Sequence, residues 1–361
     1  MTTGIRRLTS TSCRVLAAIT VLTIVLSIVD ADRSLAQDKR IRWKMASSYA
    51  ASLPILGTSG IYFTKRLEEA TNGRIRIKFF DPGKLVPGLQ VFEAVSTGGV
   101  QVGYTAAGFW IGKIPAAAFF GSVPFGPDTD EYLAWIFEGG GLQLWRDLYA
   151  KHNLVPYPCG VLPPEASGWF RTPITSAEQL KGLKMRFYGL GGKAMQKLGM
   201  SIQLLAPGDI FTALDRGVLD ATEFSMPAID ERLGFYEIAK HYYFPGWHQQ
   251  ASLLELLINK KDWEALTKID QLLIEMSCRD TILKSMTEGE ALQGPALERM
   301  KAKGVQIHEW SPEMLAKFRE ATNEVIEEEA AKDRDFARVW DSLSKFRANY
   351  AQWSKLSRIP Q

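Results

Sequence analysis

The chain has 361 residues, of which 43 are Lys or Arg and 40 are Asp or Glu, giving a formal net charge of +3. A charge this close to balance argues against nucleic acid, or any strongly anionic surface, as a partner. The length suffices for two domains of ordinary size.

The first residues are predicted to be an export signal. Arg6 and Arg7 belong to a basic head, residues 15–29 form an apolar core, and Ser34-Leu-Ala36 is a small-x-small cleavage site. The alternative is a membrane anchor, but about fifteen apolar residues fall short of the roughly 20 that span a bilayer. We therefore expect cleavage after Ala36 and a periplasmic protein.

The next part of the chain alternates predicted strands with predicted helices. The spacing of apolar residues predicts strands over 41–46, 74–80 and 100–105, and helices over 52–71 and 90–97. This order of elements is typical of an α/β lobe.

An aromatic stretch rich in Gly and Pro follows at 109–125. A single aromatic residue most often belongs to the core. We interpret Tyr104 and Trp110 as ligand-wall residues, because both stand near a strand end that faces the predicted cleft. A helix is expected over 132–151, and a strand over 154–161 is expected to cross toward a second lobe.

A second unit of the same kind is predicted beyond that strand. A glycine-rich turn at Gly189 opens one helix, and Asp209 is placed as the N-cap of another. Ligands bind where the strands of such doubly wound sheets end, which brings Arg186, Glu223 and Phe224 within reach of one cleft. The expected elements are 183–187, 189–198, 201–205, 210–216 and 220–225.

The last third of the chain is predicted to be mainly helical. A strand over 252–259 returns to the first lobe, and a long helical stretch, 262–302, is expected to kink or break near Gly294 and Pro295. A final helix over 336–357 carries an apolar stripe, which either docks on the protein's own body or packs on a second copy as a homodimer. The other expected elements and the stripe are 304–308, 312–333, Trp340, Leu343, Phe346, Tyr350 and Trp353.

These elements divide the chain into four predicted parts. They are the signal 1–36, a first lobe of 37–160 with 252–310, a second lobe of 161–251, and a C-terminal helical segment, 311–361.

Several long strings carry a family resemblance: LKGLKMR, LGGKAMQKLG, GWFRTPI and the run from IFTALDRG to FPGWHQQ. From about Ile41 to the C-terminus the chain resembles the extracytoplasmic solute receptors of TRAP (tripartite ATP-independent periplasmic) transporters, most closely the branch that takes 2-oxo acids. The resemblance implies an α/β, two-lobe periplasmic binding protein fold with a hinge and long C-terminal helices. It also implies that TRAP membrane subunits are partners and that the ligand is a small 2-oxo or 2-hydroxy monocarboxylate.

Arg186 stands in a strand otherwise suited to burial, where an arginine is costly unless an anion meets it. Its planar guanidinium can hold a carboxylate through two parallel hydrogen bonds, which a lysine cannot do. The alternative is a salt bridge to an acidic side chain. The resemblance implies a carboxylate clamp, because the family's clamping arginine lies in the same KGLKMR context.

Glu165 and Glu223 would repel an anionic ligand unless a cation lay between. In similar receptors a metal ion bridges protein and substrate, and the resemblance places Glu223 and the Phe224 carbonyl on its ligand segment. We expect Glu165 to be a further ligand of this ion. Relatives tend to have Gln at the position of Glu165 and Trp at that of Phe224. The extra charge at Glu165 favours Ca²⁺ over Na⁺, whereas the alternative is that Glu165 is simply exposed on a Pro-rich loop.

Four further residues near the cleft receive separate predictions. Arg171 either touches the ligand or steadies the clamp, and Trp247 and Gln249 are expected to close the cleft, Gln249 by hydrogen-bonding a keto or hydroxyl oxygen. For His248 we favour a hydrogen-bonded structural role.

No catalytic set emerges from the sequence, and we predict that the protein is not an enzyme. The four histidines have no ligand-like spacing, and no nucleophile elbow or phosphate loop is present. Gly189, Gly191 and Ala194 fit a loose dinucleotide fingerprint, which is weak evidence alone. The rivals are another ligand (a longer oxo acid, a sugar acid, an aromatic carboxylate or a polyol), a ligand sensor, and an exported lyase.

Cys159 and Cys278 remain after the signal and its Cys13 are removed. The periplasm permits a disulfide, but nothing in the sequence places the two within bridging distance, and we favour two buried, unpaired side chains.

Overall fold

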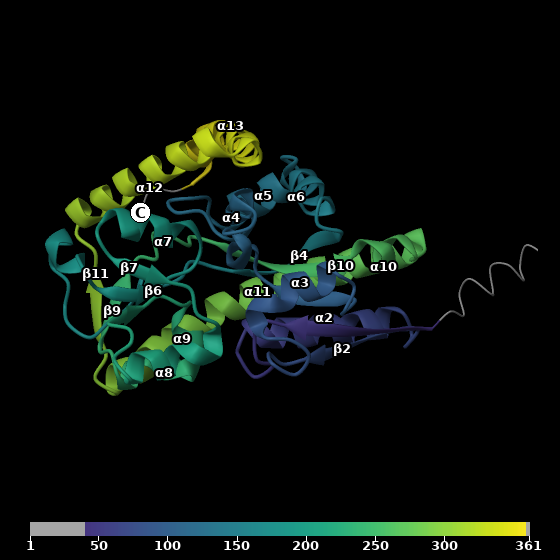
Figure 1. The fold of residues 1–361 in the computed structure, drawn as a ribbon, viewed down its shortest axis with the longest axis horizontal. Helices are drawn as coiled ribbons and strands as arrows, with labels where there is room; N and C mark the ends of the chain where they lie inside the picture. Colours follow the sequence, from purple (N-terminus) through teal and green to yellow (C-terminus); the bar gives the residue numbers. More distant parts are fainter. Residues whose placement is uncertain (1–39, 359–361) are drawn as a thin grey trace, which may run out of the picture.

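A computed structural model describes residues 40–358, and in it the chain forms two lobes, each built on its own mixed β-sheet (Figure 1). The predicted signal, 1–36, lies outside the described residues. Within residues 40–358, no helix is both long enough and apolar enough to cross a membrane.

Lobe I is built on a five-stranded sheet of order β2-β1-β3-β10-β4. β1 pairs in parallel with β2 and β3, whereas β10 is antiparallel to both of its neighbours. The strands are β1 (Ile41–Ser47), β2 (Ile75–Phe80), β3 (Val102–Thr105), β4 (Leu154–Leu162) and β10 (Ser252–Asn259). The helices are α2 (Leu56–Ala70), η1 (Gly88–Gln90), α3 (Val91–Ser96), η2 (Ala107–Trp110), η3 (Pro115–Ala117), α4 (Ala118–Gly121), α5 (Thr129–Phe137), α6 (Gly141–Ala150) and α10 (Lys260–Glu264).

Lobe II is built on a six-stranded sheet of order β11-β9-β5-β8-β6-β7. The strands are β5 (Gly168–Phe170), β6 (Lys184–Arg186), β7 (Ser201–Gln203), β8 (Ala221–Thr222), β9 (His241–Phe244) and β11 (Gln306–Glu309). The helices are η4 (Ala177–Leu180), α7 (Gly189–Lys197), η5 (Pro207–Asp209), α8 (Ile210–Asp215), α9 (Pro227–Leu233) and η6 (Phe235–Glu237).

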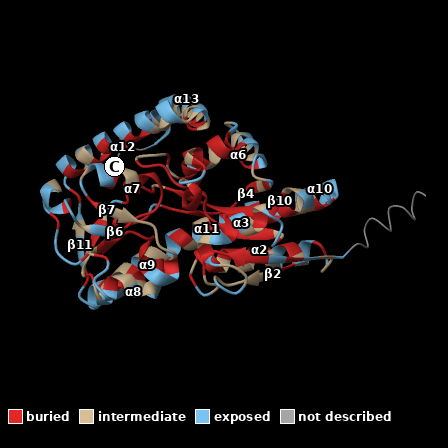
Figure 2. Cartoon of the chain, in the orientation of Figure 1, coloured by how far each residue is buried: buried red, intermediate tan, exposed pale blue. Residues whose placement is uncertain are grey.

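Apolar spacing explains why these segments form their elements. In α2, Leu56, Phe63 and Leu67 recur at helical spacing and are all buried. β10 is buried at all eight positions, as expected of a strand covered on both faces. Burial is concentrated in the two sheets and in the inner faces of the helices around them (Figure 2).

More segments join the lobes than the two that we expected. Besides the β4–β5 and β9–β10 connections, the helix α11 (Lys268–Ala302) packs on α2 and β4 in lobe I and on α9 in lobe II (Figure 1). α12 (Pro312–Lys332) packs on α7 of lobe II, and α13 (Arg334–Ser357) runs on to α6 of lobe I.

Three local expectations differ from the structure. α11 continues through Pro295, whose ring is exposed, so that only an outer hydrogen bond is lost. The expected helix over 132–151 is two helices, because Gly140 is in the left-handed region at φ 85°. Asp209 stands before α8 but its side chain makes no capping hydrogen bond, because η5 already leads into that helix.

The strand that we expected at 304–308 belongs to lobe II, not to the first lobe. β11 pairs in parallel with β9, because α11 has by then carried the chain across to the second sheet. The expected range 252–310 therefore contains residues from both lobes.

The two remaining cysteines are paired, which corrects our expectation of free side chains. Cys159 on β4 and Cys278 on α11 form a disulfide across a sequence separation of 119 residues, and both are fully buried. The bond joins a strand and a helix that each continue toward lobe II.

The apolar stripe of α13 packs mainly on the protein's own lobe I. Phe119 of α4 contacts Phe336 and Trp340, with ring centroids 4.5 and 5.6 Å apart. Trp353 is 66 % exposed and Leu356 is 85 % exposed at the end of the helix.

Candidate functional site

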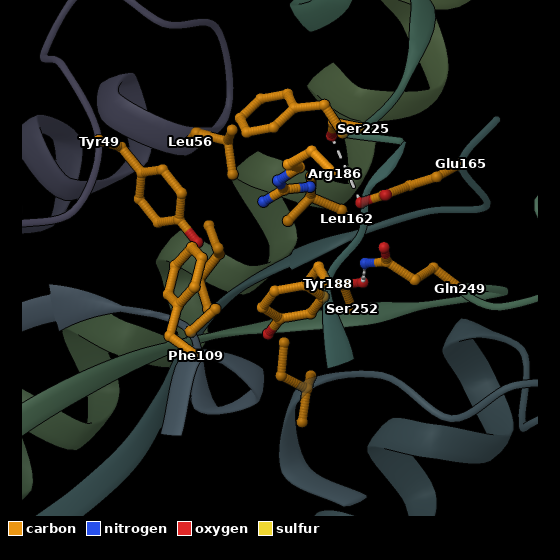
Figure 3. A pocket seen from close by; sticks show the side chains of 14 residues that line it. Tyr49, Leu56, Phe109, Leu162, Glu165, Arg186, Tyr188, Ser225, Gln249 and Ser252 are labelled. Atoms are coloured by element: carbon orange, nitrogen blue, oxygen red, sulfur yellow. Dashed lines mark hydrogen bonds between the residues drawn. The ribbon is translucent and has the colours of Figure 1, made fainter. Parts of the chain in front are cut away.

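A cavity lies where the two lobes meet (Figure 3). One side is formed by lobe II, the opposite side by lobe I, and the rest by the crossing segments after β4 and after β9.

The lobe II side is formed by the ends of two neighbouring strands. β6 and β8 are parallel and adjacent, so their carboxyl ends meet at one edge of the sheet. Arg186 ends β6 with Tyr188 two residues beyond, and Phe224 and Ser225 follow β8. The strand-end reasoning that predicted a cleft beside Arg186 is consistent with this placement.

Arg186 is 1 % exposed and is tied to lobe II through Nη1 and, by a longer hydrogen bond of 3.5 Å to the Leu205 carbonyl, through Nε. Nη1 donates to the backbone oxygen and to the carboxylate Oε2 of Glu223, each at 2.8 Å, and the guanidinium lies over the Phe224 ring. Nη2 has no hydrogen-bond partner among residues 40–358. The salt bridge that we considered as an alternative therefore exists, and it leaves donor capacity of the guanidinium unused.

Two carboxylates lie beside this arginine, and both have unsatisfied oxygens. Ser225 Oγ hydrogen-bonds Glu165 Oε1 at 3.3 Å, but Glu165 Oε2 and Glu223 Oε1 have no partner among the described residues. Burial, and then the charges of Glu223 and Asp230, raise the pKa of the Glu165 carboxyl well above its usual range. Glu165 is buried, not exposed on a loop as the alternative had it.

A third buried acid lies beneath this pair. Asp230 Oδ2 accepts hydrogen bonds from Trp169 Nε1 at 2.8 Å and from Tyr242 Oη at 2.9 Å. Burial raises the pKa of Asp230 to about 7, against the pull of these two bonds. Acidic side chains are thus concentrated behind the lobe II side of the cavity.

His248 lies in this cluster, although we expected a hydrogen-bonded structural histidine. Its ring is buried, neither ring nitrogen has a hydrogen-bond partner within the described chain, and Nε2 lies 3.4 Å from Glu223 Oε1. Glu165, Glu223 and His248 each offer a ligand atom within 4.8 Å of the others. Unpartnered carboxylate oxygens this close together fit a hard cation, which prefers oxygen ligands.

The lobe I side of the cavity is apolar apart from two hydroxyls, those of Tyr49 and of Ser252 at the start of β10. Tyr49 follows β1 and belongs to this side, and burial raises the pKa of its phenol well above the usual range, so the group stays neutral. The apolar lining residues are Leu56, Ala106, Phe109, Leu162, Leu253 and Leu254.

Four of the predicted ligand residues line this cavity: Glu165, Arg186, Phe224 and Gln249. Gln249 Nε2 donates to Ser252 Oγ at 2.5 Å, and its Oε1 has no partner among the described residues. Glu223, predicted as a metal ligand, is fully buried directly behind Arg186.

Tyr104 and Trp110 lie outside the lining, contrary to our expectation. Tyr104 Oη donates to the Cys159 carbonyl at 2.9 Å, within the lobe I core. Trp110 Nε1 donates to the buried Glu255 at 2.7 Å, and its neighbour Phe109 faces the cavity instead.

Arg171 and Trp247 also lie outside the lining. Arg171 is exposed and donates to the Leu214 carbonyl. Trp247 packs in the second hydrophobic cluster, where it stacks on Phe318 and Phe125 with centroids 4.8 and 5.4 Å away.

Among the lining residues that were not predicted, three are aromatic: Tyr49, Phe109 and Tyr188. A usable signal existed for two of them. Tyr49 follows the end of β1, and Tyr188 stands two residues after Arg186, so the strand-end reasoning applied to Arg186 covers both.

The sequence of the chain is similar to one protein family. The family model described as bacterial extracellular solute-binding protein, family 7 (DctP), matches residues 46–333. The monocarboxylate 2-oxoacid-binding periplasmic protein of Nostoc sp. is 38 % identical over 320 residues, which cover 88 % of this chain and 87 % of that protein.

Solved structures agree with this similarity. A TRAP transporter solute-binding protein from Bordetella bronchiseptica, with copurified calcium and picolinate, superposes with a TM-score of 0.86 at 34 % identity, covering 88 % of this chain and 95 % of that one. A TRAP periplasmic solute-binding protein from Pseudoalteromonas atlantica, with bound sodium and pyruvate, gives a TM-score of 0.85 at 30 % identity, covering 88 % and 97 %.

Proposed function

The chain belongs to the DctP family of bacterial extracellular solute-binding proteins, and from this premise we propose that it binds a small 2-oxo or 2-hydroxy monocarboxylate for a TRAP transporter. The family consists of transport receptors, not enzymes. The ligand is held by Arg186 and by a metal ion that bridges the protein and the ligand.

One observation carries this proposal. Arg186 is fixed by Glu223 through Nη1, and the remaining nitrogen of its fork, Nη2, is unpartnered within the described chain, beside the cavity. A buried guanidinium with unused donors suits a carboxylate, because a charge-assisted hydrogen bond satisfies both groups.

The metal part of the proposal rests on the unpartnered oxygens of Glu165 and Glu223. These two side chains and the Phe224 carbonyl would hold the ion, which supplies positive charge between two carboxylates and an anionic ligand. Pyruvate and picolinate, the ligands of the two solved relatives, each place a second donor atom next to the carboxylate. Both molecules can therefore chelate one cation, which supports a 2-oxo or 2-hydroxy acid here.

Calcium is the cation that the donor set favours. Glu165 and Glu223 give two carboxylates, and a higher ligand charge strengthens binding of Ca²⁺ relative to a monovalent ion. His248 beside them is a donor that suits zinc better than calcium, so a metal screen that includes Zn²⁺ tests the assignment.

The lobe I side favours a short ligand with an apolar tail. Its lining side chains offer two hydroxyls, those of Tyr49 and Ser252, whereas Phe109 and the leucines offer none. The Ser252 hydroxyl already accepts a hydrogen bond from Gln249. A sugar acid or a polyol would leave several hydroxyl groups unpaired against this surface, at a cost for each.

Isothermal titration calorimetry with pyruvate, lactate, glucuronate and glycerol tests this function. We expect pyruvate or lactate to bind to calcium-loaded protein, to lose most of its affinity in EDTA, and to regain it with Ca²⁺. Binding that ignores EDTA and the exchange of Na⁺ for K⁺ would refute the metal bridge, and a preference for glucuronate would refute the ligand class.

The proposed partners are the two TRAP membrane subunits, with the protein acting in the periplasm. The homodimer through the C-terminal helix stays a prediction. At the end of α13, Trp353 of the stripe and the nearby Leu356 are exposed, so a second copy could pack on them. Light scattering of the wild type and of Trp353→Ser tests it, with a monomer for both as the contradicting result.

A further inference from the structure

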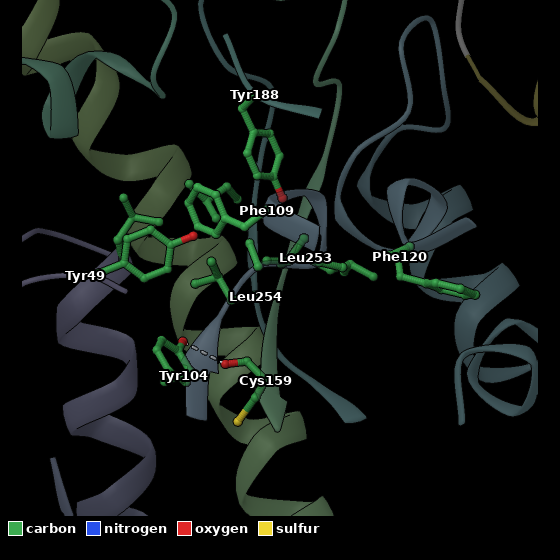
Figure 4. Packing of buried hydrophobic residues seen from close by; sticks show 14 of the residues in the cluster. Tyr49, Tyr104, Phe109, Phe120, Cys159, Tyr188, Leu253 and Leu254 are labelled. Atoms are coloured by element: carbon green, nitrogen blue, oxygen red, sulfur yellow. Dashed lines mark hydrogen bonds between the residues drawn. The ribbon is translucent and has the colours of Figure 1, made fainter. Parts of the chain in front are cut away.

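Tyr188 is a side chain of lobe II that inserts into lobe I. It lies between β6 and α7 and is 6 % exposed. Its hydroxyl accepts a hydrogen bond from the Gly108 N–H at 2.8 Å, and its ring meets the Phe109 ring edge-on at 5.1 Å (Figure 4). Both partners belong to η2 of lobe I.

Two glycines make the space that the tyrosine occupies. A Cβ atom added at Gly108 would lie 2.7 Å from Tyr188 Cε1, and one added at Gly121 would lie 2.7 Å from Tyr188 Oη. Neither glycine is in the left-handed region, so their backbone conformations would accept alanine. The glycines therefore provide room for Tyr188.

The same residue is bonded to the proposed carboxylate site. The Tyr188 N–H donates to Glu223 Oε2 at 3.1 Å, the oxygen that also accepts from Arg186 Nη1. Arg186, Glu223 and Tyr188 thus form one hydrogen-bonded unit within lobe II. The position of the tyrosine is tied to the groups that hold the ligand.

We propose that Tyr188 is the closure residue of this receptor: a positioning residue that enters the Gly108–Gly121 slot as lobe II closes, and so couples capture of the acid to closure. This inference rests on the proposed function. Contacts between Tyr188 and the slot form only when the lobes are together, so a ligand that orders the Arg186–Glu223–Tyr188 unit stabilises the closed state.

Glycine substitutions in the slot test this role, with a matched control in the same segment. Gly108→Ala blocks the slot, whereas an added Cβ at Gly112 meets nothing within 4 Å and Gly112 is not in the left-handed region. The readouts are the radius of gyration from small-angle scattering and pyruvate affinity, both with Ca²⁺. We expect Gly108→Ala to keep the ligand-free radius and to bind at least tenfold more weakly, and Gly112→Ala to match wild type.

A double-mutant cycle separates closure from general damage to lobe I. Removing the ring with Tyr188→Ala relieves the overlap, so adding Gly108→Ala to that variant should cost no further affinity. Tyr188→Phe keeps the ring and loses one hydrogen bond, so we expect a loss of less than tenfold together with faster amide exchange at Gly108. An equal cost of Gly108→Ala in both backgrounds would overturn the proposal.

Failure of this inference differs from failure of the proposed function. If the wild type binds pyruvate, and Gly108→Ala closes and binds it equally well, the proposed function stands. The closure role of Tyr188 is then overturned. Wild-type protein that binds no tested acid would remove the function. The closure role would then be tested by amide exchange at Gly108 in the ligand-free protein. Faster exchange in Tyr188→Phe than in the wild type would support the contact between Tyr188 and Gly108, and an unchanged rate would overturn the closure role.

Discussion

The two sides of the cavity differ in chemistry. Lobe II contributes Arg186 with Glu223 behind it, fixed by hydrogen bonds within that lobe. Lobe I contributes leucines, Phe109 and the hydroxyls of Tyr49 and Ser252. The charged groups therefore need nothing from lobe I to hold their positions.

This difference indicates a division of labour between the lobes. Lobe II can attract and orient an anion while the cavity is still open, because its donors are already in place. Lobe I then excludes water, and a charge–charge contact is stronger once water has left. Under the proposed function, charge would select the carboxylate, and the apolar side would select the size and polarity of the rest of the ligand.

The largest effect is expected from removing the lobe II cation. Arg186→Ala should weaken pyruvate binding at least about thirtyfold, because truncating one partner of a buried charge pair costs about 2–5 kcal/mol. Arg171→Ala is the matched control in the same lobe, since Arg171 is exposed and away from the lining. Calorimetry measures both, and equal affinities for the two variants would contradict the account.

The sequence led to Arg186 and Glu165 because a buried cation and a carboxylate facing an anion are each unfavourable without a partner. It could not give the direction of a side chain at a loop. Phe109 and Trp110 are adjacent aromatic residues, and only the contact of Trp110 with Glu255 decides which one faces the cavity.

The sequence alone also could not predict which residues far apart in the chain pair with each other. Cys159 and Cys278 are 119 residues apart, and only the packing of α11 on β4 brings them together. The strand at 304–308 was placed in the wrong lobe for the same reason, because its partner β9 is distant in the chain. The elements themselves were predicted well where apolar spacing is regular, as in β10 and α12.

A second prediction concerns the buried acid of lobe I. Burial raises the pKa of Glu255 from 4.5 to about 8, against the hydrogen bond from Trp110. Because the pKa of Glu255 is higher in the folded state than in the unfolded state, its contribution to the free energy of unfolding is fully present below pH 4.5. This contribution is lost as the pH rises toward 8. Glu255→Gln lacks this loss. Its free energy of unfolding should therefore rise relative to that of the wild type by about 2–4 kcal/mol between pH 5 and pH 8.

Urea unfolding at several pH values measures this difference. Asp230→Asn is the corresponding variant in lobe II. Its gain in the free energy of unfolding over the wild type should level off near pH 7, because the pKa of Asp230 is raised to about 7. Parallel stability curves for wild type and Glu255→Gln would show that Glu255 does not titrate in this range.

A third prediction addresses the metal. Glu165→Gln removes one of the two carboxylates and should lower Ca²⁺ affinity about tenfold while changing Na⁺ affinity less, because Ca²⁺ binding depends on ligand charge. Titration of metal-stripped protein with each ion measures the two affinities. An equal loss for both ions would contradict the assignment of calcium.

The smallest effect is expected on the lobe I side. Tyr49→Phe removes one of the two hydroxyls of that side and should weaken pyruvate binding about threefold to tenfold, the worth of one neutral hydrogen bond. Leu56→Ala enlarges the apolar side and should favour a longer 2-oxo acid over pyruvate. Competition calorimetry measures both, and a Tyr49→Phe loss as large as that of Arg186→Ala would erase the difference between the lobes.

A crystal structure of the protein with pyruvate and Ca²⁺ tests the central claim most directly. The account predicts the carboxylate on Arg186 Nη2 and the ion between Glu165, Glu223 and the Phe224 carbonyl, with the methyl group toward Phe109. Pyruvate bound with its carboxylate toward lobe I, with the Arg186 guanidinium bonded to Glu223 alone, would contradict it.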